Sequence, residues 1–107
     1  MKDIQLAMTK DDIYSLINRR RRQILVHSVI YYKLNDNLVS DYTWSSWGKE
    51  LVELQKKYPD ISDEVPYANA FQDFDPSTGY SLPLDDPWAV SKAVYLLKIG
   101  RNKNGTC

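Results

Sequence analysis

The stretch YYKLNDNLVSD, residues 31–41, separates two segments whose apolar residues recur with helical spacing. At its centre, Asn35, Asp36 and Asn37 are residue types that favour turns. The apolar positions before the turn are Ile13, Ile17, Ile24, Tyr31 and Leu34, and those after it are Trp44, Trp47, Leu51, Leu54 and Tyr58. Two amphipathic helices joined by a short polar link fold back on each other. The sequence therefore predicts an antiparallel helical hairpin over residues 11–34 and 41–58.

Capping residues mark where these two helices begin and end. Thr9 is the expected N-cap of the first helix, with Asp12 three residues later completing a capping box. Either Ser40 or Asp41 is expected to cap the second helix. Pro59 should end that helix, because a proline disfavours helical geometry in the residue before it.

Two further helices are expected after the hairpin. We interpret residues 59–64 as a linker and predict a short middle helix over residues 66–71, PYANAF. The Asp86-Pro87-Trp88 sequence is a typical helix start and predicts a C-terminal helix over about 87–99. Gly100 is the expected end of that helix.

No strand pair is evident, so the expected fold is all-α, with one domain over residues 1–107. Residues 13–62 would contain the hairpin, and residues 63–100 would close the core through a loop and the last helix. The polar loop at 73–86, DFDPSTGYSLPLDD, is long for a small domain, which is typical of functional segments. We expect it to pack down through Phe74, Tyr80 and Leu82.

Composition narrows the function classes. Hydrophobic residues make up 43% of the 107, and the 14 basic and 14 acidic residues cancel. A balanced charge argues against a dedicated nucleic-acid coat protein. Cys107 is the single cysteine, and no signal peptide or membrane span is evident. These features favour a cytoplasmic protein without a disulfide framework and without a membrane partner.

The segment IYYKLNDNLVSDYTWSSWGKELVELQKKYPDI, residues 30–61, resembles the small N-terminal domain, domain Ia, of NAD-dependent bacterial DNA ligases. The resemblance covers roughly residues 13–62. In those ligases the domain grips the nicotinamide mononucleotide half of NAD during self-adenylation. The adenylation domain, with its lysine motif, has no counterpart in this sequence. The resemblance therefore implies an all-α scaffold with a nucleotide-facing bend.

The resemblance also assigns a set of nucleotide-facing residues. Tyr31 falls at the first such tyrosine of the family, Tyr32 at a His or Tyr, and Asp41 at the aspartate of a Ser-Asp pair. Trp44 replaces a tyrosine, and Ser45 replaces an aspartate. The implied site is an aromatic box with one carboxylate, which would hold a cationic nicotinamide ring by stacking and cation–π attraction.

Small stand-alone proteins similar to this domain occur on phage and prophage genomes. The resemblance thus implies a non-catalytic accessory protein of phage type. We expect a protein-binding module that modulates a host or phage DNA-handling or defence complex, without a cofactor. The expected partner-facing residues are tyrosines near the polar loop and the bend: Tyr42, Tyr67 and Tyr80.

Two alternatives stay open. One is a binder of NAD or nicotinamide mononucleotide that uses the aromatic box. The other is a nucleic-acid accessory factor with Arg19, Arg22 and Lys33 as contacts. Four consecutive helical arginines point around the helix and cannot all face one phosphate backbone. Arg20 lies in the apolar stripe and is expected to pair with Glu50 or Glu53.

The remaining reactive side chains indicate neither catalysis nor metal binding. His27 lies on the apolar stripe, which favours a core histidine with a backbone partner. No nucleophile has a recognisable setting beside it. The loop carboxylates Asp73, Asp75, Asp85 and Asp86 lack the spacing of a calcium-binding loop and are interpreted as turn formers. Trp44, Trp47 and Trp88 are all expected in the core.

Overall fold

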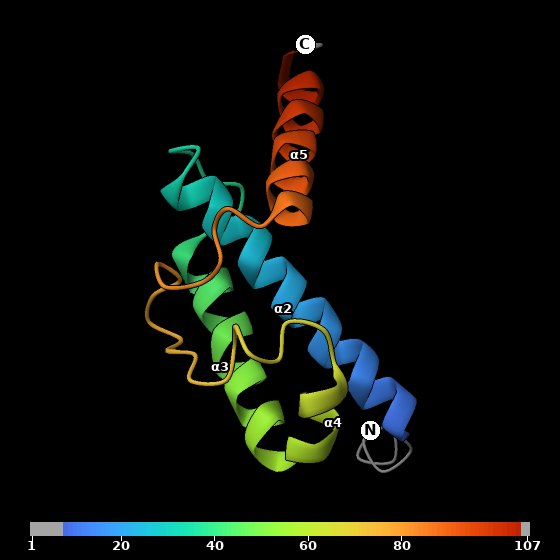
Figure 1. The fold of residues 1–107 in the computed structure, drawn as a ribbon. Helices are drawn as coiled ribbons and strands as arrows, with labels where there is room; N and C mark the ends of the chain where they lie inside the picture. The colour runs from blue at the N-terminus through green and yellow to red at the C-terminus, as the bar shows by residue number, and fades with distance from the viewer. Residues whose placement is uncertain (1–7, 106–107) are drawn as a thin grey trace.

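The chain folds as helices joined by turns, with no strand in the described part. The computed structural model describes residues 8–105, so the expectation for Cys107 lies outside it. The helices are α2 (Lys10–Tyr32), α3 (Asp41–Lys57), α4 (Pro59–Glu64) and α5 (Pro87–Gly105). Figure 1 shows α2 and α3 side by side, α4 beside the N-terminal half of α2, and α5 near its C-terminal half. The predicted all-α class is confirmed.

The helical hairpin forms as predicted, with a slightly earlier bend. The first helix ends at Tyr32 instead of residue 34. The amide of Leu34 donates to the carbonyl of Val29, and the amide of Asp36 donates to that of Ile30. Asn35 takes a left-handed conformation with φ of 55°, which an asparagine tolerates better than most residues. These bonds use the last carbonyls of α2 and turn the chain towards α3.

Both predicted caps are present. The amide of Asp12 donates to Thr9 Oγ1 at 3.1 Å, and the amide of Thr9 donates to Asp12 Oδ2 at 2.9 Å. Ser40, rather than Asp41, caps α3 by accepting from the amide of Thr43 at 3.0 Å.

The short middle helix was predicted in the wrong place. The predicted linker at 59–64 is helix α4, and the predicted helix at 66–71 is a series of turns. Pro59 occupies the first turn of α4, where a proline costs no hydrogen bond. Tyr67 takes a φ of 70°, which a right-handed helix does not allow.

The last helix begins as predicted and continues past its predicted end. Asp86 Oδ2 accepts from the amide of Ala89 at 3.0 Å, so Asp86 caps α5. Gly100 lies inside this helix, which reaches Gly105. A glycine ends a helix when it adopts a positive φ, and none of the described glycines does so.

Arg21 ties three parts of the chain to α2. Its side chain is 1% exposed. Nε donates to Gln55 Oε1 of α3 at 3.0 Å, and Nη2 donates to the Ser62 carbonyl and hydroxyl of α4 at 3.1 and 2.6 Å. Nη1 donates to the carbonyls of Val65 and Pro66 at 2.9 and 3.1 Å. All five donors of the guanidinium are therefore used by neutral acceptors.

The hydrophobic core lies where α2 meets the other elements. Its buried residues are Ile13, Ile17, Ile24, Leu25, Val26, Val29, Ile30, Leu51, Val65, Phe71, Leu82, Leu84, Ala89, Ala93 and Leu97. Trp44 and Trp47 pack against this cluster half-buried, whereas Trp88 is 38% exposed, so its predicted core position is wrong. The Arg22 guanidinium lies 4.6 Å from the Trp88 ring centroid and covers it. Over the described residues, no helix has the length and apolar character needed to cross a membrane.

Candidate functional site

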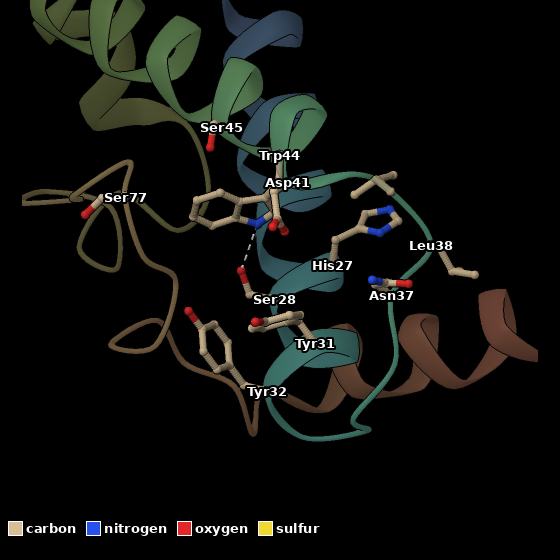
Figure 2. Close-up of a pocket in the computed structure, with 11 residues that line it drawn as sticks. His27, Ser28, Tyr31, Tyr32, Asn37, Leu38, Asp41, Trp44, Ser45 and Ser77 are labelled. Atoms are coloured by element: carbon tan, nitrogen blue, oxygen red, sulfur yellow. Dashed lines mark hydrogen bonds between the residues drawn. The ribbon is translucent and has the colours of Figure 1, made fainter.

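A cavity of about 290 Å³ opens at the bend between α2 and α3. Its wall is formed by the last turns of α2, the link to α3, the first turns of α3 and one residue of the 73–86 loop (Figure 2). The lining residues are His27, Ser28, Tyr31, Tyr32, Asn37, Leu38, Val39, Asp41, Trp44, Ser45 and Ser77.

The four residues assigned to a nucleotide by the ligase resemblance all line this cavity. Tyr31 and Tyr32 end α2, whereas Asp41 and Trp44 occupy the first turn of α3. The hairpin places the end of one helix beside the start of the next, so both pairs face the same space. Ser45, at the position of the second family aspartate, lines it as well.

Trp44 is fixed in the cavity wall by α2 and the loop. Its indole Nε1 donates to Ser28 Oγ at 3.2 Å, and Ser28 Oγ donates to the Ile24 carbonyl at 2.7 Å. A methyl group on Gly79 would lie 2.3 Å from Ser28 Oγ and 3.0 Å from Trp44 Cζ2. The loop can therefore approach this wall so closely only because residue 79 is glycine.

The two tyrosines of α2 differ in how they are held. The hydroxyl of Tyr32 hydrogen-bonds to Thr78 Oγ1 at 3.0 Å, and its ring packs edge-on against Tyr80 at 5.5 Å. Tyr31 is 53% exposed, and its ring meets that of Tyr32 at 4.8 Å. Tyr32 is therefore fixed by the loop, while Tyr31 leaves a free aromatic surface.

Asp41 is the single carboxylate in a lining without lysine or arginine. The neighbouring lining groups are hydroxyls, an amide and aromatic rings. A cavity of this composition attracts a cation or a neutral polar ring and disfavours an anion. No three His, Cys, Asp or Glu side chains of the described part gather in a way that could hold a metal ion.

His27 was missed as a lining residue. Its imidazole is half-buried and lies 5.5 Å from the Trp47 ring. Its Nδ1 is buried without a hydrogen-bond partner, so the predicted backbone partner is wrong. Burial lowers the pKa of His27 below its ordinary 6.5. One signal was present in the sequence: His27 lies four residues before Tyr31, on the same helix face.

The four consecutive arginines at 19–22 have different structural roles. Arg20 donates to Glu50, which confirms one of the two predicted partners. Arg22 donates to Asn18 Oδ1 at 2.9 Å and stacks over Trp88 and over the Tyr67 ring at 5.3 Å.

Of the predicted nucleic-acid contacts, Arg19 and Lys33 are exposed. They lie 14 positions apart, which is roughly 21 Å along a helix. With Arg22 held against aromatic rings, the three side chains do not form one cluster of free charge.

The three tyrosines predicted for protein contact differ in their exposure. Tyr42 is 82% exposed and Tyr80 is 72% exposed. Tyr67 is half-buried, and its hydroxyl donates to Asp86 Oδ2 at 2.9 Å. Two of the three are therefore exposed on the surface, and Tyr67 helps to hold the start of α5.

Comparison with known proteins agrees with the resemblance inferred at the bend. About half of this chain resembles DNA ligases. It is 39% identical over 51 residues to the DNA ligase of Pseudothermotoga lettingae, covering 48% of this chain and 8% of the ligase. The DNA ligase of Acholeplasma laidlawii is 34% identical over 54 residues, covering 50% of this chain and 8% of the ligase.

A third relative, the DNA ligase of Petrotoga mobilis, is 44% identical over 41 residues, covering 38% of this chain and 6% of the ligase. The chain thus spans less than a tenth of the curated relatives it matches. No family model matches it. No solved structure matches it either.

Proposed function

We propose that this chain is a non-catalytic binding module whose cavity takes the nicotinamide portion of NAD or nicotinamide mononucleotide. One observation carries the proposal. Tyr31, Tyr32, Asp41 and Trp44, chosen from the sequence by their match to the ligase domain, line a single cavity. They come from two helices and are spread over 14 positions, so their convergence depends on the hairpin.

The chemistry of the cavity suits a flat cationic ring. The exposed ring of Tyr31 offers π-electron density at its face, and Asp41 supplies a negative charge in the same cavity. A cation over an aromatic face gains about 0.5–2 kcal/mol. The volume of about 290 Å³ is near the small end of ligand pockets. We therefore expect the ring and its ribose inside and the rest of the nucleotide outside.

Thermal unfolding with nicotinamide mononucleotide tests this function. A ligand at 100 times its dissociation constant adds about 2.7 kcal/mol to the stability of the folded state. The melting temperature of the wild type should therefore rise with ligand concentration. Asp41→Asn and Tyr31→Ala should remove that rise, and Tyr42→Ala, at an exposed tyrosine outside the cavity lining, should keep it. A wild type that does not respond to NAD or to the mononucleotide would refute the proposal.

A second candidate is the docking of a protein partner, as an accessory factor of phage type acting on a DNA-handling or defence complex. The exposed rings of Tyr42 and Tyr80 support it, because exposed tyrosines supply large contact area at low entropic cost. The amount of partner protein that the chain captures from a bacterial lysate should then fall in Tyr42→Ala and in Tyr80→Ala. Tyr95→Ala, at another exposed tyrosine on α5, is the control. If all three variants lost the partner protein equally, Tyr42 and Tyr80 would not be its specific contacts.

A further inference from the structure

His27 is a polar group of the cavity that the fold leaves unsatisfied. It belongs to α2, one helical turn before Tyr31, and makes no hydrogen bond among the described residues. Its ring packs against Trp47 on one side and lines the cavity on the other. Figure 2 shows it at the side of the cavity bordered by Asn37 and Leu38.

The two ring nitrogens differ in their surroundings. Nδ1 is shut off from solvent and has no partner, so Nε2 is the nitrogen left to face the cavity. A buried N–H without an acceptor is rarer in proteins than a buried lone pair without a donor. The neutral tautomer with its proton on Nε2 therefore fits this site best. Burial, which lowers the pKa of His27, also keeps the ring uncharged near neutral pH.

An uncharged donor in the same cavity as Asp41 selects between ligands that differ only in charge. A carboxamide offers a carbonyl oxygen to Nε2–H and brings no negative charge. A carboxylate in the same place would share the cavity with Asp41, and the lining has no lysine or arginine to offset the repulsion.

We propose that His27 is a specificity-determining residue: its Nε2–H donates to the carboxamide oxygen of the bound ring, and with Asp41 it makes the cavity select nicotinamide mononucleotide over nicotinic acid mononucleotide. This inference rests on the function proposed above. It adds a residue and a direction of selectivity that neither the ligase resemblance nor the comparisons supply.

Calorimetric titration of the wild type with both mononucleotides tests the selectivity. Nicotinamide mononucleotide should bind about tenfold more tightly, since one unfavourable charge contact in a partly enclosed site is worth roughly that factor. Equal affinities, or tighter binding of the acid, would overturn the inference while leaving the proposed function in place. Failure of both nucleotides to bind would overturn the function and the inference together.

Three substitutions test the role of Nε2. The amide nitrogen of a glutamine can take the place of Nε2, whereas that of an asparagine falls near Nδ1. His27→Gln should therefore keep most of the affinity for nicotinamide mononucleotide. His27→Asn and His27→Phe should weaken it about three- to tenfold, the loss of one net hydrogen bond.

His27→Phe keeps a ring against Trp47, so its melting temperature without ligand reports whether the fold is intact. With the fold intact, wild-type affinity in His27→Phe would overturn the proposed donor. If His27→Phe fails to fold, the comparison between His27→Gln and His27→Asn tests the donor instead. Equal affinities of these two variants for nicotinamide mononucleotide would overturn the role of Nε2.

Discussion

At the scale of single residues, Arg21 shows how a charge can be buried without an ion pair. Its guanidinium is held by neutral oxygens from α3, α4 and the turn that follows α4. Burial lowers the pKa of Arg21 well below its ordinary value, to about 10, while the charge of Asp63 opposes that shift. Its position in the sequence indicates this burial: Arg21 follows Ile17 by four positions and precedes Ile24 by three, on the buried stripe.

Replacing Arg21 should destabilise the fold strongly. Arg21→Ala would leave the Val65 and Pro66 carbonyls and the Ser62 side chain without their donor. Urea unfolding should show that the free energy of unfolding falls by about 3 kcal/mol or more. Arg21→Lys should recover little of it, because an ammonium cannot reproduce the planar set of donors. Arg19→Ala, at the exposed arginine of the same run, should change stability by no more than about 0.5 kcal/mol.

His27 predicts a pH dependence of stability with a defined sign. Its pKa is lowered in the folded state relative to the ordinary 6.5, because burial disfavours the charged ring. Below pH 6.5 the unfolded chain therefore takes up a proton before the folded chain does, and stability falls as the pH falls through the folded pKa. In urea unfolding between pH 7.5 and pH 5, His27→Phe should lose less stability than the wild type. An equal loss in both proteins would contradict the lowered pKa.

At the scale of elements, proline and glycine explain what could and could not be predicted. Pro59 was correctly expected to end one helix, but it also begins α4, because the first turn of a helix needs no amide at that position. Gly100 was expected to end α5, yet a glycine ends a helix only where tertiary contacts favour a positive φ. The sequence identifies such residues, but tertiary packing determines whether each of them begins, ends or lies within a helix.

The fit of the 73–86 loop against the hairpin depends on Gly79. A methyl group there would overlap Ser28 Oγ at 2.3 Å, so Gly79→Ala must displace either the loop or the Ser28 side chain that holds Trp44. Overpacking of this kind costs about 1–3 kcal/mol, measurable by urea unfolding. Gly100→Ala is the matched control: its methyl would meet Leu38 Cδ2 at an ordinary 3.6 Å, in a helix that favours alanine over glycine. Equal effects of the two substitutions would show that the loop does not pack as described.

At the scale of the whole molecule, the ligase-like hairpin and the C-terminal part share one core. Periodicity and caps were enough to predict the hairpin, its bend and the start of the last helix, because those signals are local. The four cavity residues could be chosen from the resemblance. His27 and the contacts of Ser28, Thr78 and Gly79 could not, because they depend on how a distant loop packs on α2.

The hairpin should therefore not be stable alone. Of the fifteen buried hydrophobic residues among those described, seven lie beyond residue 64: Val65, Phe71, Leu82, Leu84, Ala89, Ala93 and Leu97. A chain ending at residue 64 would also lack two of the carbonyls that Arg21 binds. Circular dichroism should show reduced helicity and no cooperative melting for this fragment. A cooperative transition near that of the full chain would show that the hairpin is an autonomous unit.

The bond between Tyr32 and Thr78 joins residues 46 positions apart at the rim of the cavity. The cavity is therefore complete only once the second half of the chain has docked on the first, and partly folded chains offer no equivalent site. A small molecule held there would bind the folded chain alone, so raising its concentration would lower the fraction of chains that are open to proteolysis.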